Sequence, residues 1–320
     1  MSEEERLFSG IEYSAPHRAK LAGLLKNKKL PPSDKQRVQE ALGRYEDWVA
    51  AMRSLDSEGD ERVEELVRLM NDYKRYVELE VIWDSDHEFL FRQRGQLKID
   101  NSIIEEFLPY LADERMVPDL KDTEYVSGPY KTFSSAYFTA TLTNAAKGGG
   151  LETRTKDQDF TVGRTAHLRA SFDPAFPPAA TVTERIYLAF VAAECKTNLD
   201  KTMFQEAVST ARDIRTAIPG SRYYLLCEWL DMTPISTEST DISEAIILRG
   251  RRLGADQRSG LADPETRRER RDWYERFLAE HPIRDDRILR FVGHLRTLFK
   301  PAEVDEGSVA YYERARSLQR

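Results

Sequence analysis

Apolar side chains recur every three or four residues near both ends of the chain, which is the spacing of an amphipathic helix. The pattern predicts three helices before residue 98 and two after residue 249, over 15–26, 33–55, 60–81, 264–281 and 285–299. Ser33 follows Pro31-Pro32 and is the expected N-cap of the second helix. We therefore predict a helical region at each end of the chain.

The middle of the chain changes to the short apolar runs that are typical of strands. The run 185–196 is apolar on both faces, as in a strand buried at the centre of a sheet. Around it the pattern predicts a helix, a loop-rich stretch, a first strand, a crossover helix and a further strand, over 103–111, 113–155, 159–170, 200–217 and 221–229. The last two strands should be joined by a right-handed parallel crossover.

These elements predict an α/β protein with a mixed central sheet and flanking helices. We place a helical N-terminal region at 1–98, the α/β core at 99–248, and an arginine-rich helical C-terminal region, packed on the core, at 249–320.

Composition narrows the class of protein. The chain has 320 residues, of which 40% are hydrophobic and 32% charged, as in an ordinary globular protein with ample core. No apolar stretch approaches the length of a membrane span, the first residues do not follow the order of a signal peptide, and Cys195 and Cys227 lie in apolar runs. We therefore expect a cytoplasmic protein with reduced cysteines and no membrane partner. The net charge of −7 argues against nonspecific coating of nucleic acid but leaves room for a local basic cleft.

The most informative residues end the buried strand, as Glu194-Cys195-Lys196. Side chains alternate along a strand, so Glu194 and Lys196 share one face and Cys195 lies on the other. A carboxylate and an ammonium are costly at the end of a buried strand unless something binds them. A divalent metal and a phosphate would use both.

A metal that activates water on a phosphodiester usually needs a second carboxylate. An antiparallel pairing of 159–170 with 185–196, reflected about the centre of the connection 172–183, places Asp159 opposite Lys196. A bulge could move this register by a few residues, but Asp159 would stay near the Glu194 end. Asp157 lies one alternation upstream on the same face and remains the alternative.

The order of helix, strands, crossover helix and strand, with Asp159, Glu194 and Lys196 at the strand ends, resembles the PD-(D/E)xK nuclease superfamily. Within it, the chain resembles the type II restriction endonucleases. Thr155-Lys-Asp-Gln-Asp-Phe160 and Glu194-Cys-Lys-Thr-Asn-Leu-Asp-Lys-Thr-Met-Phe-Gln-Glu-Ala207 are similar to the branch that cuts short interrupted sites. Gln158 stands where the family usually has a proline.

The resemblance implies the roles of the site residues. Asp159, Glu194 and the backbone carbonyl of Cys195 would bind Mg²⁺, which lowers the pKa of a bound water. Lys196 would position or deprotonate that water, or stabilise charge in the transition state; to act as a base it would need a lowered pKa. Many family members add a glutamate from the first core helix, and their register favours Glu105. Helical geometry alone does not choose between Glu105 and Glu106, since both flank the apolar stripe.

Further residues are candidates for DNA contact. Lys131 lies among aromatic and hydroxyl side chains, and Gln205 lies one turn into the crossover helix. Arg267, Arg268 and Arg271 form a basic cluster that could contact phosphate. Acidic residues are interleaved with these arginines, so a solvated helix with internal ion pairs is an equally good interpretation.

The resulting hypothesis is a Mg²⁺-dependent, site-specific endonuclease of double-stranded DNA in a restriction–modification system, leaving 5′-phosphate and 3′-hydroxyl ends. Cutting two strands requires two sites, so a homodimer is expected, with a heteromeric partner as the other possibility, and a DNA methyltransferase as functional partner. The helical ends would support target recognition, dimerisation or both. The alternatives are a structure-specific repair or recombination nuclease, and a DNA-binding module that keeps the core without catalysis.

Overall fold

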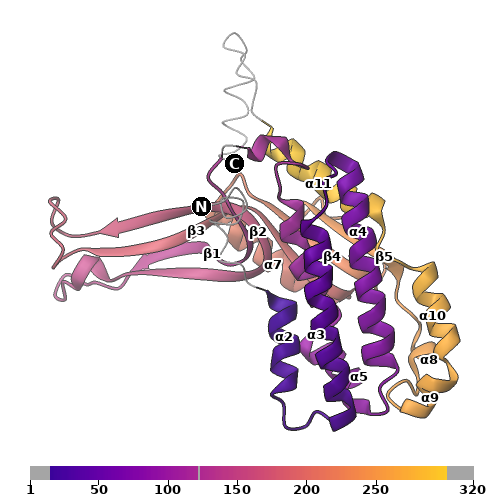
Figure 1. Cartoon of the computed structure of the whole chain (residues 1–320). Helices are drawn as coiled ribbons and strands as arrows, with labels where there is room; N and C mark the ends of the chain where they lie inside the picture. Colours follow the sequence, from indigo (N-terminus) through magenta and orange to yellow (C-terminus); the bar gives the residue numbers. More distant parts are fainter. Residues whose placement is uncertain (1–14, 122, 301–320) are drawn as a thin grey trace.

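The computed structural model describes residues 15–121 and 123–300, and Figure 1 shows their arrangement. A five-stranded sheet runs in the order β1-β2-β3-β4-β5. Its strands are β1 (Val126–Phe138), β2 (Leu151–Ala170), β3 (Val182–Leu199), β4 (Arg222–Leu230) and β5 (Glu244–Arg251). β1, β2 and β3 pair antiparallel, whereas β3, β4 and β5 pair parallel, so the sheet is mixed as predicted.

Helices cover both faces of the sheet. One layer precedes β1 and comprises α2 (Pro16–Leu25), α3 (Pro32–Arg53), α4 (Gly59–Tyr76), the π-helix η1 (Val77–Trp83), α5 (Glu88–Leu97), α6 (Ser102–Phe107), η2 (Leu108–Leu111) and η3 (Pro118–Leu120). α7 (Lys201–Ala217) is the crossover helix, and η4 (Lys147–Gly150) lies between β1 and β2. After β5 come α8 (Ala255–Arg258), α9 (Pro264–Glu269), α10 (Arg271–Glu280) and α11 (Asp285–Phe299).

The alternation along β3 divides the core into two parts. Val191, Ala193 and Cys195 pack with the N-terminal helices and α11, whereas Ala189 and Ala192 pack with α7. α7 begins where Asp200 accepts a hydrogen bond from the Met203 backbone N–H (2.8 Å), which is a side-chain N-cap. The result is an α/β/α arrangement with β3 buried at its centre, as its apolar sequence predicts.

A buried ion network joins the N-terminal helices to the sheet. Lys74 Nζ lies 3.4 Å from Glu78 and 3.1 Å from Glu228, and Arg249 lies 3.0 Å from Glu78 and 3.1 Å from Glu228. All four side chains are buried. Because the partners come from α4, η1, β4 and β5, breaking one pair would leave an uncompensated charge between two layers.

The structure differs from the sequence prediction at several places, and α5 and α8 were not predicted. The stretch 113–155, predicted as loop, contains β1 and the start of β2, and β5 extends past residue 248 into the region predicted to be helical. Ser33 is not the N-cap, because α3 already begins at Pro32, whose fixed φ suits the first turn of a helix. Residues 301–320 of the predicted C-terminal region lie outside the described residues.

β1, β2 and β3 extend beyond the helical layers as an arm (Figure 1). Large apolar side chains are exposed around its tip, among them Phe138 (64% exposed) and Phe172 (69% exposed). Gly148 turns the chain there with φ of +59°, and a Cβ at this position would lie 2.7 Å from Val182. Only glycine fits this combination of backbone angle and close approach.

Candidate active site

The pairing of β2 with β3 decides which acidic residue lies beside the Glu194-Cys195-Lys196 triplet. Phe160 pairs with Ala193, so Asp159 comes level with Glu194 rather than with Lys196. The register shifts between Val162 and Gly163, where the strands approach so closely that a Cβ on Gly163 would lie 2.1 Å from the Leu188 carbonyl oxygen. The predicted register is therefore wrong by two residues, although Asp159 still lies at the Glu194 end.

Asp159 is hydrogen-bonded to the backbone at the end of β3. Its Oδ2 accepts a hydrogen bond from the Cys195 backbone N–H at 2.8 Å. Burial, followed by the nearby charge of Glu105, raises the pKa of Asp159 to about 6. Asp157, the alternative, is exposed and pairs across the sheet with Lys131 on β1. The fold thus brings Asp159, and not Asp157, to the triplet.

Glu194 and Lys196 form a close ion pair at 2.6 Å, with the side chains 25% and 17% exposed. Tyr223 on β4 donates its hydroxyl hydrogen to Glu194 Oε2 at 2.8 Å. Burial acts to lower the Lys196 pKa, but the hydrogen bond and charge of Glu194, with Asp159 and Glu206 adding to them, outweigh it and leave the pKa raised. Lys196 is therefore a cation in this state, in contrast to the lowered pKa that a catalytic base requires.

The backbone of Cys195 connects the two sides of the site. Its N–H donates to Asp159, and its carbonyl accepts from Asn101 Nδ2 at 3.3 Å. The thiol is buried in the layer of N-terminal helices, where burial raises its pKa well above the usual range. Both cysteines are free and buried, as predicted. Cys195 can therefore offer a carbonyl oxygen but not a reactive thiolate.

The structure distinguishes Glu105 from Glu106. Glu105 lies near Asp159 and forms ion pairs with Lys20 (3.1 Å) and Lys98 (3.9 Å). Glu106 turns away and accepts hydrogen bonds from the backbone N–H groups of His17 (2.8 Å) and Arg18 (3.3 Å) and from the Tyr45 hydroxyl. Those N–H groups open α2, which has no side-chain cap of its own, so Glu106 caps it from a distant element.

We expect Glu106→Ala to lower the free energy of unfolding by about 2–3 kcal/mol, because it removes the cap of α2 and the buried partner of Tyr45. Glu105→Gln should cost less stability and lower the cleavage rate instead. Urea denaturation and a DNA cleavage assay on both variants measure the two effects. Equal destabilisation by the two substitutions would contradict the division of roles.

The donors fit a magnesium ion. Asp159 and Glu194 offer carboxylate oxygens, Cys195 offers a carbonyl oxygen, and Mg²⁺ is commonly bound by one or two carboxylates together with waters and substrate phosphate. Burial, followed by the charge of Glu105, raises the pKa of Asp159, and a bound divalent cation would favour its ionised form. Among the described residues, no group of three or more His, Cys, Asp or Glu side chains is placed to hold a metal ion, so the candidate ligands are two carboxylates and a backbone carbonyl.

The family model of the Bpu10I restriction endonuclease matches residues 96–312 of the chain. The chain belongs to the Bpu10I restriction endonuclease family. The chain is also similar to a solved structure described as "native BbvCI A2B2 tetramer at low resolution", with a TM-score of 0.61 and 21% identity over 89% of this chain and 96% of that chain. At this identity the likeness shows a shared fold. No curated protein matches the chain.

Membership of the restriction endonuclease family confirms the resemblance stated from the sequence and implies nuclease chemistry on DNA. The fold class is confirmed as well, since the mixed sheet with flanking helices is shared with the BbvCI chain. No helix within the described ranges is long and apolar enough to cross a membrane.

The predicted DNA contacts have very different surroundings. Lys131 is exposed on β1, and Gln205 is exposed on α7. Arg268 is exposed with an ion pair to Asp86 (3.4 Å), and Arg271 pairs with Asp84 (2.7 Å) and Glu275 (2.8 Å). Exposure leaves Lys131, Gln205 and Arg268 available for contact with DNA.

The prediction of a DNA contact is wrong for Arg267, which is fully buried. Its guanidinium donates to five backbone carbonyls, those of Trp83, Ser85, His87, Leu261 and Ala262, at 2.7–3.1 Å. The Trp83 indole N–H in turn donates to the Arg267 carbonyl (2.7 Å). Arg267 therefore joins α9 to the end of η1, with its guanidinium buried and occupied by backbone carbonyls.

We expect Arg267→Ala to destabilise the protein by about 3–5 kcal/mol, because it leaves several buried carbonyls without donors and opens a cavity. Arg268→Ala, the adjacent exposed position, should change stability by less than about 0.5 kcal/mol. Urea unfolding of the two variants measures the difference. A stable Arg267→Ala protein with selectively weakened DNA binding would restore the original interpretation.

Proposed function

We propose that this chain is a Mg²⁺-dependent, site-specific endonuclease of double-stranded DNA that acts in a cytoplasmic restriction–modification system alongside a cognate methyltransferase. The observation that carries the proposal is the convergence of Asp159, Glu194 and Lys196 at the end of β3, in a member of a restriction endonuclease family. The proposed products carry 5′-phosphate and 3′-hydroxyl ends.

Each residue of the candidate active site has a distinct role in the proposed reaction. Asp159, Glu194 and the Cys195 carbonyl would hold Mg²⁺, which supplies charge neutralisation at the phosphate and an acidified water when it is bound. Lys196, kept protonated by its neighbours, faces the same point and stabilises negative charge that develops on the phosphate. Tyr223 and Asn101 orient Glu194 and the Cys195 carbonyl through their hydrogen bonds. Glu105 would act beside Asp159.

We infer that the chain works in an assembly with a second catalytic subunit, because one site cuts one strand. The BbvCI structure is described as an A2B2 tetramer, which contains two kinds of chain. That description supports an assembly with a non-identical chain as well as with a second copy. Within the chain, we propose that the core at 99–248 carries out cleavage. The helical regions at 1–98 and 249–320 would serve target recognition or assembly.

Digestion of a plasmid of known sequence tests the proposed function. Discrete fragments in Mg²⁺, abolished by a chelator and restored by added metal, are the expected result. Cutting of branched DNA alone would instead indicate a structure-specific nuclease. Binding of DNA in Ca²⁺ without cleavage in Mg²⁺ or Mn²⁺ would indicate a non-catalytic module.

A further inference from the structure

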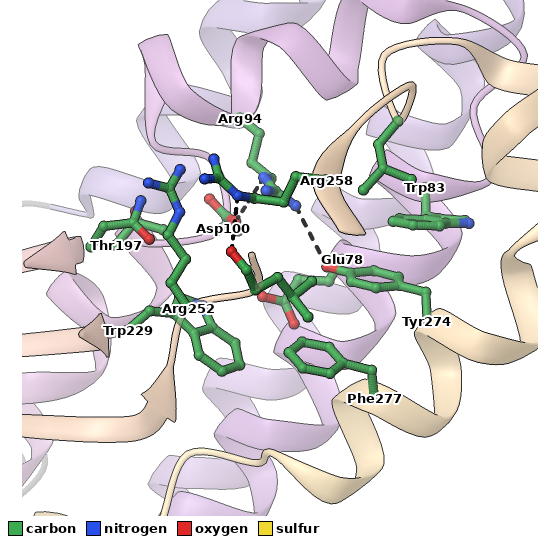
Figure 2. A pocket seen from close by; sticks show the side chains of 13 residues that line it. Glu78, Trp83, Arg94, Asp100, Thr197, Trp229, Arg252, Arg258, Tyr274 and Phe277 are labelled. Atoms are coloured by element: carbon green, nitrogen blue, oxygen red, sulfur yellow. Dashed lines mark hydrogen bonds and ion pairs between the residues drawn. The ribbon is translucent and has the colours of Figure 1, made fainter. Parts of the chain in front are cut away.

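A small recess of about 60 Å³ opens at the end of β3, next to the residues that follow Lys196. Figure 2 shows guanidinium groups of Arg94, Arg252 and Arg258 gathered on one side and the rings of Trp229, Tyr274 and Phe277 on the other. Its walls come from α5, the end of β3, the end of β4, and the segments that follow β5.

The recess begins where the catalytic strand ends. Thr197 and Asn198 line it, and they follow Lys196 directly along β3. At ~3.3 Å per residue of extended strand, Asn198 lies ~7 Å beyond Lys196. A DNA strand rises ~3.4 Å per nucleotide, so the recess is within a few nucleotides of a phosphate held at the Asp159–Lys196 site.

The arginines of the recess have unused capacity for an anion. Arg258 donates Nε–H to the Leu253 carbonyl (3.0 Å) and has no carboxylate within ion-pair distance among the described residues. Arg94, whose side chain is 32% exposed, reaches Asp100 only at 3.7 Å and the Tyr274 hydroxyl at 3.5 Å. Arg252 is paired with Asp231. Arg94 has only long contacts and Arg258 has no ion pair among the described residues. Both guanidinium groups therefore keep N–H donors that an oxyanion could accept from.

The charge of Glu78 in the lining of the recess is already compensated. Glu78, which lines it, is compensated by Arg249 and Lys74 in the buried network described above. Glu78 and Trp83 both belong to the π-helix η1, a distortion that is frequent at functional sites. Trp83 stacks on Tyr274 and Trp229 stacks on Phe277, so two aromatic pairs fix the apolar walls. Asp100 also lines the recess and offsets the charge of Arg94 at 3.7 Å, so the positive charge that stays unpaired is that of Arg258.

We propose that this recess binds a phosphate group of the DNA backbone, near the phosphate that is cleaved, with Arg258 and Arg94 as its ligands. The proposal rests on the proposed endonuclease function. It assigns the recess a positioning role: phosphate contacts fix the register of a duplex on a protein without reading bases.

Arg258→Gln tests the proposal, because it removes the charge of a partly buried residue without leaving a carboxylate unpaired. Binding of DNA that the wild type cleaves is measured in Ca²⁺ over a range of salt concentrations. We expect affinity to fall ~10-fold and the slope of log K against log salt to decrease by ~0.9, the value for one lost phosphate contact. KM should rise while kcat at saturating DNA changes little, as for an interaction equal in ground and transition states.

Two variants serve as controls. Arg276→Gln removes the same charge from an exposed position on α10 and should leave affinity, slope and KM unchanged. Arg258→Lys keeps the charge and should restore most of the salt slope. Circular dichroism and thermal unfolding of each variant establish that the fold is retained.

Inorganic phosphate separates the two sources of the same ligand. Its binding to the wild type is followed through the fluorescence of Trp83 and Trp229, which line the recess. If Arg258→Gln loses free phosphate but binds DNA with an unchanged salt slope, the recess takes free phosphate and the DNA assignment is overturned. If neither ligand is affected, the recess is not a phosphate site. Absence of any cleavage by the wild type would instead count against the endonuclease function itself.

Discussion

Replacing Lys196 with alanine is expected to abolish detectable DNA cleavage, a fall of ~10³-fold or more, while DNA binding and the fold are retained. The ammonium of Lys196 lies 2.6 Å from Glu194 and its pKa is raised, so it supplies a fixed positive charge at the point where the phosphate would bind. The side chain is 17% exposed at the end of a strand, and removing it opens no cavity in either core cluster.

Single-turnover cleavage of a plasmid and binding in Ca²⁺ measure the two parts of this prediction. Lys35→Ala, at an exposed lysine of α3, is the matched control and should cleave normally. Lys196→Arg separates the possible roles, because a guanidinium keeps the charge but does not give up its proton. Residual activity in Lys196→Arg above that of Lys196→Ala supports charge stabilisation. Cleavage by Lys196→Ala at the wild-type rate would show that the proposed mechanism is wrong.

Asp159→Asn is expected to lower cleavage by a comparable factor, whereas Asp157→Asn is expected to leave it close to wild type. Asp159 accepts a hydrogen bond from the Cys195 N–H beside the triplet, whereas Asp157 is exposed and pairs across the sheet with Lys131 on β1. Asparagine removes the charge that a metal requires but keeps an oxygen that can accept from Cys195 N–H. The comparison decides between the two aspartates that the sequence left open.

Stability provides an independent readout for Asp159→Asn. The pKa of Asp159 is about 6 in the folded chain, above the usual value of 3.8, so the metal-free folded state binds more protons than the unfolded state between these values. Metal-free stability contributed by this group therefore falls as pH rises from about 4 to about 6. At pH 7 we expect Asp159→Asn to melt at or above the wild-type temperature in a chelator. A large loss of stability would mean that lost activity reflects unfolding instead of a missing ligand.

The sequence alone determined the features that depend on neighbouring residues. The apolar run before Glu194 predicted a central strand, because a strand packed on both faces must be apolar at every position. The three- and four-residue spacing predicted the helices. The predicted start of the crossover helix at residue 200 is the N-cap of α7, Asp200. Alternation placed Glu194 and Lys196 together and Cys195 opposite, as the core clusters show.

Pairing between strands required the tertiary structure. The register of β2 on β3 depends on a shift between Val162 and Gly163, where β3 has one extra residue, and on the length of the turn, so Asp159 lies level with Glu194 and not with Lys196. β1 was missed because its polar and exposed positions, with Gly128 and Pro129 near its start, lack a clear apolar face. β5 was missed although its run 245–248 carried a readable apolar signal. Tyr223 was overlooked as a partner of Glu194 because only parallel pairing with β3 brings them together.

The tertiary structure also decided between residues that look alike in the sequence. Glu105 and Glu106 flank the same apolar stripe, yet Glu106 accepts hydrogen bonds from the start of α2 and from Tyr45, whereas Glu105 lies near Asp159. Arg267 and Arg268 are adjacent, yet one is buried among backbone carbonyls and the other is exposed. Local pattern fixes which face of an element is apolar, whereas the partner of a charged side chain comes from a distant segment, because charges are buried only where the whole fold supplies hydrogen bonds for them.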